Sequence, residues 1–365
     1  MKKILFACSV KKDLYRIASL VNEIRIGEAE LEPIICYCGY PINYVLLNDP
    51  VIGIRIPIPD YYINLPSGLL DFQVSSLMEQ FDSIIEKIKP ELIIVPGYHY
   101  LALGYCLAAS EKDIPICNLD AGLRPLWKEN QLQDVQKPMD GLTSLFFVSE
   151  PANIEILVLN NVDPERIFFA GNPLFEALAG LTDKLNVTSV SATSSYGEFA
   201  LGYFFCGWDV SGSTEKKEIR KIIKTVSDVI PLVIPMYSSW KLRLSQILRG
   251  ITFKNVHFMD QMEYPDYLAL IRAARFVITD SNTIQEESSF FGVPCLTLNN
   301  ITDRPVTVSH GTNILTGRDI PKIINHVEMI KHHDPHHQLV NEFFYENAGS
   351  KMVSHIKEFL ESNGN

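Results

Sequence analysis

The stretch FVITDSNTIQEESSFFGVPCLTL, residues 276–298, decides the fold because it contains a strand, a turn, a helix and a second strand in succession. Phe276–Thr279 is an apolar run of strand length with β-branched residues, and a polar turn after it leads into a helical pattern over 284–291. A Gly-Val-Pro sequence ends that pattern, and Cys295–Leu298 has the composition of another strand. The stretch therefore predicts a βαβ unit.

The turn of this unit has the residue types of a phosphate site. A helix that begins directly after a strand presents unpaired backbone N–H groups and the positive end of its dipole. Ser281, Asn282 and Thr283 add hydroxyl and amide donors there, which makes the turn suitable for a phosphate. Arg304 follows the next strand on a loop, and a guanidinium suits bidentate contact with phosphate. An ordinary βαβ unit without a ligand is the alternative interpretation.

Strands and helices alternate along the rest of the chain, which predicts an α/β fold of two Rossmann-like domains with parallel sheets. The uninterrupted apolar run 92–95 is typical of a central strand that is covered on both faces. We place the N-terminal domain in residues 1–172 and the C-terminal domain in residues 173–345. Ligands of such sheets lie at the carboxyl ends of the strands, so we expect a binding cleft between the domains.

Composition excludes several functional classes. The chain has 365 residues, 47% of them hydrophobic and 21% charged, which is typical of globular domains. Its formal net charge of −11 argues against nucleic-acid binding, which depends on clustered Lys and Arg. No run approaches 18 apolar residues, so we expect no membrane span and a cytoplasmic protein. The chain has no Gly-x-Gly-x-x-Gly or Walker pattern and no convincing metal-ligand spacing, so we expect neither a cofactor nor a metal.

The order of residues in the C-terminal half resembles the signature of the UDP-N-acetylglucosamine 2-epimerase family. The matching segments are TDS-x-x-IQEE at 279–287, GVPCLTL at 292–298, TDRPVT at 302–307 and GTN at 311–313. In the N-terminal half, AGLR at 121–124 and NVDPERIFFAGNP at 161–173 are similar to the family. The resemblance implies a GT-B-like fold, a UDP-sugar ligand and a homodimer. It also implies that a C-terminal helix within 346–365 packs back on the N-terminal domain.

The resemblance implies six UDP-binding residues: Ser281, Asn282, Thr283, Glu287, Arg304 and Tyr267. In the family, the serine and the two residues after it hold the phosphates, the second glutamate of QEE holds the ribose hydroxyls, and the arginine lies near the phosphates. Tyr267 matches an aromatic residue that meets uracil, and a core position on a helix face is its alternative. The family has Gly-Gly where this chain has Asn282-Thr283, which changes how closely the backbone can approach a phosphate.

The resemblance also implies catalytic positions. Family members remove the C2 proton of the sugar and expel UDP from C1 through a 2-acetamidoglucal, so they need acid/base groups and positive charge. Asp120 stands where the family has a glutamate before AGLR, and Lys11 takes the position of an arginine after the first strand. His99 follows a tyrosine that replaces the family's aspartate, and Asp209 is adjacent to a tryptophan near the family's histidine. A cap at a strand exit is the alternative for Asp120, and an exposed loop histidine is the alternative for His99.

Two functions remain open at this point. The first is an epimerase, hydrolysing or non-hydrolysing, that acts at C2 of a UDP-N-acetylhexosamine. The second is a catalytically altered relative that binds UDP-sugars, or a GT-B-type glycosyltransferase that uses the same nucleotide. The replaced positions at Lys11, His99, Asp120 and Asp209 separate the two, because an epimerase requires them to serve one reaction.

Overall fold

The computed structural model describes the chain except residues 28–29, 39–55, 125–132, 183–184, 186–195, 205–212, 237–243, 249, 251–252, 261, 263, 333–346 and 364–365. The chain divides into two units. Unit 1 comprises Met1–Arg124, Lys128–Lys184 and Asn341–Asn365, and unit 2 comprises Pro125–Trp127 and Leu185–Val340. Each unit contains one parallel sheet with helices, so the predicted fold of two Rossmann-like α/β domains is confirmed.

The sheet of unit 1 has seven parallel strands within the described residues, in the order β3-β2-β1-β4-β5-β6-β7. The strands are β1 (Lys2–Cys8), β2 (Leu31–Cys38), β3 (Tyr61–Ile63), β4 (Leu92–Pro96), β5 (Ile116–Leu119), β6 (Leu145–Val148) and β7 (Ile167–Phe169). Every residue of β4 is buried, as its apolar sequence predicts. The strand order reverses between β1 and β4, and the loops after those strands form the usual ligand side of such a sheet.

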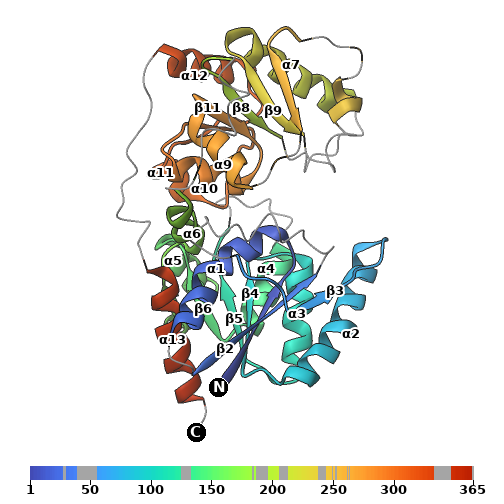
Figure 1. The fold of residues 1–365 in the computed structure, drawn as a ribbon, viewed down its shortest axis with the longest axis vertical. Coiled ribbons are helices and arrows are strands. Elements are labelled where there is room, and N and C mark those ends of the chain that lie inside the picture. Colours follow the sequence, from blue (N-terminus) through green and yellow to red (C-terminus); the bar gives the residue numbers. More distant parts are fainter. Residues whose placement is uncertain are drawn as a thin grey trace. The chain divides into compact units, whose positions relative to one another are not determined.

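The helices of unit 1 are α1 (Lys11–Ile26), α2 (Leu70–Ile88), α3 (Tyr100–Ser110), α4 (Gln133–Leu142), α5 (Ala152–Leu159), the short 3-10 helix η2 (Pro164–Arg166), α6 (Pro173–Thr182) and α13 (Ala348–Ser362). The C-terminal helix α13 packs on α1 and α6 (Figure 1). The backbone N–H of Gly349 donates to Glu176 Oε2 at 2.9 Å, and a Cβ at Gly349 would lie 3.0 Å from the carbonyl oxygen of Ser19. This close approach joins the last helix of the chain to its first.

The sheet of unit 2 has six parallel strands within the described residues, in the order β10-β9-β8-β11-β12-β13. The strands are β8 (Ala200–Tyr203), β9 (Leu232–Met236), β10 (Val256–Asp260), β11 (Phe276–Thr279), β12 (Cys295–Thr297) and β13 (Asn313–Leu315). The helices are α7 (Ser213–Val229), α9 (Tyr264–Ala273), α10 (Asn282–Phe290), α11 (Pro305–Ser309) and α12 (Ile320–His332). The predicted βαβ unit is β11-α10-β12, and the strand order reverses between β8 and β11, directly before α10.

The turn after β5 has an unusual backbone. Asp120 and Gly122 both have positive φ, at 59° and 74°. A Cβ at Gly122 would lie 2.8 Å from the carbonyl oxygen of Asn153 on α5, closer than real Cβ contacts. The N–H of Gly122 donates to the hydroxyl of Tyr98 at 2.9 Å, so the turn is tied to the loop after β4.

We expect Gly122→Ala to lower the free energy of unfolding by about 2–4 kcal/mol, because left-handed backbone strain adds to overpacking against α5. Urea denaturation measures the change. Gly141→Ala is the matched control, since Gly141 is helical and a Cβ there meets nothing within 4 Å. Equal stability of the two variants would contradict the packing argument.

Candidate functional site

The turn between β11 and α10 has the backbone geometry of an anion site. Ser281 is the N-cap of α10 with φ −95° and ψ 127°, and its hydroxyl forms no capping hydrogen bond. Asn282 and Thr283 begin the helix, whose first turn contains no acidic residue. The first N–H groups of α10 therefore lie at the carboxyl edge of the sheet, where the strand order reverses, with the positive end of the helix dipole.

Glu287 lies on α10 and is 1% exposed. The hydroxyl of Tyr264, the first residue of α9, donates to Glu287 Oε1 at 2.5 Å. Tyr203 ends β8, and its pKa is raised by burial and by the negative charges of Glu287 and Asp280. Its ring centroid lies 5.3 Å from that of Tyr267, which is 2% exposed. The buried ring of Tyr267 favours its core alternative, while Glu287 lies close to the carboxyl ends of β8 and β11.

Arg304 is buried at the start of α11, with 4% of its surface exposed. Its Nη1 lies 3.3 Å from Glu286 Oε1 on α10. The backbone N–H of Arg304 donates to Thr302 Oγ1 at 3.0 Å. The ion pair holds the guanidinium against the helix that also carries Ser281 at its cap. The structure therefore places Arg304, at the start of α11, beside the helix whose cap is Ser281.

A buried polar network connects α10 to the loop of Arg304. Gln285 Oε1 accepts from Thr302 Oγ1 at 2.6 Å and from Asn313 Nδ2 at 3.0 Å. Asn313 Nδ2 also lies 3.2 Å from Thr307 Oγ1, which donates to the carbonyl oxygen of Arg304 at 2.7 Å. Buried networks of this kind rigidify a structure when their members are satisfied. The network therefore fixes the loop of Arg304 relative to α10.

We expect Gln285→Leu to lower the free energy of unfolding of unit 2 by about 2–4 kcal/mol, because two buried donors lose their acceptor. Thermal unfolding measures the change. Gln80→Leu on α2 is the control, since the Gln80 amide bonds with Asn64 at the surface. A Gln285→Leu protein as stable as the control variant would show that the network contributes nothing to stability.

Asp120 lies directly after β5 and is 3% exposed. Its Oδ2 forms an ion pair with Nη1 of Arg16, a buried residue of α1. The pair joins the helix after β1 to the turn after β5 and places the Asp120 carboxylate at the carboxyl edge of the sheet. Because both groups are desolvated, loss of either partner leaves an uncompensated charge.

His99 is the N-cap of α3. Its Nδ1 accepts from the N–H of Ala102 at 3.1 Å, which places the proton of the neutral ring on Nε2. Nε2 lies 3.9 Å from Asp13 Oδ2, and Asp13 also accepts from the N–H groups of Ser9 and Val10. The structure thus gives His99 a capping role beside the carboxylate of Asp13 in the first turn of α1.

Tyr98 lies on the loop after β4, at the position where the resemblance predicts that an aspartate is replaced. Its hydroxyl donates to Asp140 Oδ1 at 2.7 Å, and Asp140 also forms an ion pair with Arg124. Burial raises the pKa of Tyr98 to about 12. Tyr98 is therefore a neutral structural hydroxyl that holds the turn at Gly122.

Two predicted catalytic residues are described less fully. Lys11 is the first residue of α1, and its side chain lies outside the described residues. Asp209 lies outside them entirely. Asp120 and His99 both lie on loops at the carboxyl edge of the sheet of unit 1, after β5 and β4.

Sequence reasoning did not identify Arg16, Tyr264 or Glu286 as site residues. Arg16 adjoins the buried stripe of α1, and an arginine beside a buried stripe needs a partner, which is the signal that was available. No comparable signal exists for Tyr264, because its bond to Glu287 joins residues 23 positions apart on different helices.

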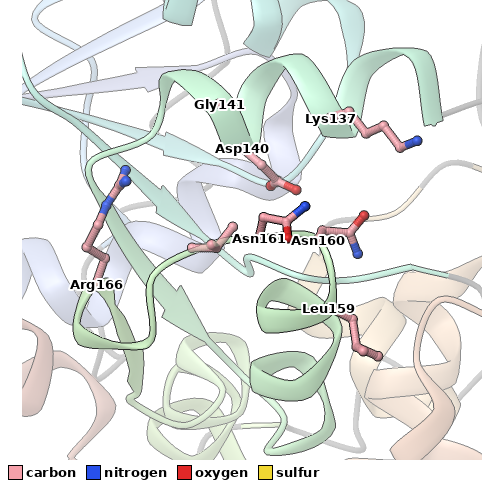
Figure 2. Close-up of a pocket in the computed structure, with 8 residues that line it drawn as sticks. Lys137, Asp140, Gly141, Leu159, Asn160, Asn161 and Arg166 are labelled. Carbon is pink, nitrogen blue, oxygen red and sulfur yellow. The ribbon is translucent and has the colours of Figure 1, made fainter.

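Unit 1 also contains a pocket of about 610 Å³, shown in Figure 2. Its lining residues are Lys137, Asp140, Gly141, Leu159, Asn160, Asn161, Val162 and Arg166. The Arg166 side chain donates to the backbone carbonyls of Thr143 and Ser144, and Asp140 pairs with Arg124. These two charged groups already hold the fold together, and none of the predicted site residues that the structure describes lines the pocket.

Within the part of the chain that the structure describes, no three His, Cys, Asp or Glu side chains are grouped as a metal site would require. No helix among the same residues combines the length and apolar character needed to cross a bilayer.

Comparisons with known proteins cover almost the whole chain. The family model described as UDP-N-acetylglucosamine 2-epimerase matches residues 25–357. The chain is 26% identical to the UDP-N-acetylglucosamine 2-epimerase of Escherichia coli strain K12, with 99% of each chain covered. It is 26% identical to the enzyme of the same name from Methanocaldococcus jannaschii, with 76% of this chain and 78% of the relative covered.

Solved structures share the fold. The Neisseria meningitidis UDP-GlcNAc 2-epimerase bound to UDP-GlcNAc has a TM-score of 0.84 at 20% identity, covering 98% of this chain and 100% of that one. The M. jannaschii UDP-GlcNAc 2-epimerase in complex with UDP-GlcNAc and UDP has a TM-score of 0.84 at 21% identity, covering 98% and 99%. The lipopolysaccharide outer core galactosyltransferase WaaB has a TM-score of 0.59 at 11% identity, covering 98% and 99%.

Proposed function

Because the chain belongs to the UDP-N-acetylglucosamine 2-epimerase family, we propose that it is an isomerase that inverts C2 of UDP-N-acetylglucosamine. The observation that carries this proposal is the arrangement of Ser281, Glu287 and Arg304. All three lie on or beside α10, where the strand order of unit 2 reverses: the first N–H groups of the helix lie at its positive end, and the guanidinium pairs with Glu286 of the same helix. A uridine diphosphate is the ligand that this order of residues fits.

We assign the nucleotide to unit 2. The N–H groups of Asn282 and Thr283 and the hydroxyl of Ser281 hold the diphosphate, Arg304 contributes positive charge, and Glu287 accepts from the ribose hydroxyls. Positive charge near the diphosphate lowers the barrier for expulsion of UDP, since the leaving group gains charge as the C1–O bond breaks. Tyr267 enters this assignment only as packing beside Tyr203.

We assign the acid/base chemistry to Asp120 in unit 1. Its carboxylate accepts the C2 proton while the C2–H electron pair forms the C1=C2 bond and the C1–O bond electrons leave with UDP. Proton return to the opposite face of C2 and re-addition of UDP complete the inversion. Arg16 pairs with Oδ2 of this carboxylate and positions it at the turn after β5. Lys11, His99 and Asp209 remain candidates for the return of the proton.

Incubation with UDP-N-acetylglucosamine in deuterium oxide tests the activity. We expect the C2 epimer with deuterium at C2, seen by proton NMR and mass spectrometry. A hydrolysing enzyme would instead release UDP and free N-acetylmannosamine. Neither deuterium, epimer nor UDP after prolonged incubation would contradict both forms of the activity.

The glycosyltransferase alternative has less support, because the likeness to a galactosyltransferase is at the level of the fold. We further propose a homodimer, which light scattering tests as a mass of about twice 41.3 kDa. The cytoplasmic location likewise stays a proposal, and cell fractionation tests it.

A further inference from the structure

The geometry points to Tyr264 as a positioning residue that holds the carboxylate of Glu287 in the orientation needed for the ribose of UDP. The inference rests on the proposed function, since the ribose is that of the proposed ligand. It adds a residue to the recognition of the nucleotide. Selection of an intact ribose diol would then depend on α9, which carries Tyr264, as well as on α10, which carries Glu287.

The side chains of Tyr264 and Glu287 are in direct contact. The phenol of Tyr264 donates to Glu287 Oε1 at 2.5 Å. A hydroxyl that donates to a carboxylate forms a short, charge-assisted bond that is roughly twice as strong as a neutral one. A glutamate side chain has three rotatable bonds, so a bond of this strength selects one orientation of its carboxylate plane.

The contact between Tyr264 and Glu287 joins a half-buried residue to a buried one. Glu287 is 1% exposed, whereas Tyr264 is half-buried, so the phenol reaches from the partly exposed start of α9 to a buried carboxylate. Glu287 lies on α10, which follows β11, and Tyr203 ends the neighbouring strand β8; the pKa of Tyr203 is raised by burial and by the charges of Glu287 and Asp280. The carboxyl ends of these two strands are the ligand side of the sheet, at the reversal of its strand order.

A ribose presents two neighbouring hydroxyls, and the carboxylate has to accept from both. A carboxylate offers about four acceptor positions, so the bond from Tyr264 to Oε1 does not exhaust its capacity to accept from the two hydroxyls of a cis-diol. Both hydroxyls are satisfied together only if the plane of the carboxylate is fixed, because recognition is lost when supporting contacts leave a group free to rotate. Tyr264 supplies that support, and a nucleotide without the hydroxyls gains nothing from it.

The test compares two nucleotides on two tyrosine variants. Calorimetry measures the dissociation constants of UDP and of 2′,3′-dideoxyuridine diphosphate for the wild-type protein, for Tyr264→Phe and for Tyr196→Phe. Tyr196 is the matched control, since its ring stacks on His257 at a centroid distance of 4.0 Å and phenylalanine keeps that contact. Thermal unfolding of each variant records any loss of stability.

For Tyr264→Phe we expect UDP affinity to fall about ten-fold, the scale of one hydrogen bond to a charged group. We expect its affinity for the dideoxy nucleotide to match that of the wild-type protein, and Tyr196→Phe to match the wild-type protein with both. An unchanged UDP affinity, or an equal loss for both nucleotides, would overturn the positioning role. If the wild-type protein does not bind UDP at all, the proposed function fails, and this inference fails with it.

Discussion

Asp120→Asn should lower turnover of UDP-N-acetylglucosamine about 1000-fold, within the range of a lost general acid/base group, while UDP binding is retained. Asparagine tolerates the left-handed backbone at this position, where φ is 59°. It cannot accept the C2 proton, and UDP binding is assigned to residues of unit 2. Steady-state kinetics and calorimetry with UDP measure the two effects separately.

The same substitution affects stability, because Arg16 is buried and loses its counter-charge. Breaking one partner of a buried pair lowers the free energy of unfolding by about 3–5 kcal/mol. The double variant Arg16→Met with Asp120→Asn removes the uncompensated charge, so we expect it to recover stability without recovering turnover. Asp163→Asn is the control, because Asp163 caps η2 and asparagine caps equally well. Turnover of Asp120→Asn within ten-fold of the wild-type rate would exclude Asp120 as the base.

Arg304→Ala should weaken UDP binding up to about 100-fold, the upper range for a charged hydrogen bond. The guanidinium lies beside α10, whose N-terminus we assign to the diphosphate. Arg304→Lys retains the charge but not the planar fork, so its loss should be smaller than that of alanine. Titration calorimetry with UDP measures both variants.

Loss of Arg304 also leaves Glu286, which is 1% exposed, without its partner, and this weakens unit 2. Arg304→Ala with Glu286→Gln separates the two effects, since it restores neutrality but not the cation. We expect this double variant to unfold at a higher temperature than Arg304→Ala and to bind UDP no better than Arg304→Ala. Arg318→Ala is the control, because Arg318 pairs with Glu218 at the surface. UDP affinity that survives in Arg304→Ala would place the phosphates elsewhere.

The alternation of the fold was predictable because buried parallel strands consist of apolar runs without polar interruption. The run over β4 and the strand-turn-helix-strand of β11-α10-β12 are of this kind, and the structure places each where its pattern predicts. The helix begins at Asn282, two residues before its apolar pattern, because its first residues are polar and carry no apolar periodicity that marks the start.

Contacts between distant residues were not predictable from patterns. The Arg16–Asp120 pair joins positions 104 residues apart, and its geometry depends on which strands become neighbours in the sheet. His99 was predicted as a catalytic candidate, and only the structure shows that its ring caps α3, because a loop histidine and a capping histidine have the same sequence context. The role of Tyr98 could likewise not be read from the sequence, because it follows from the hydrogen bond between its hydroxyl and Asp140.

Helix α13 gives the chain an order of assembly. Its residues Met352, Ile356 and Leu360 are buried, and Lys2 Nζ donates to the carbonyl oxygen of Leu360 at 2.8 Å. The hydrophobic core of unit 1 is therefore incomplete until residues 348–362 have been synthesised. All residues of unit 2 are synthesised before them. Because domains fold as units during synthesis, unit 2 can fold before unit 1 is complete, and the face of α1 that receives α13 stays uncovered until residues 348–362 have been synthesised.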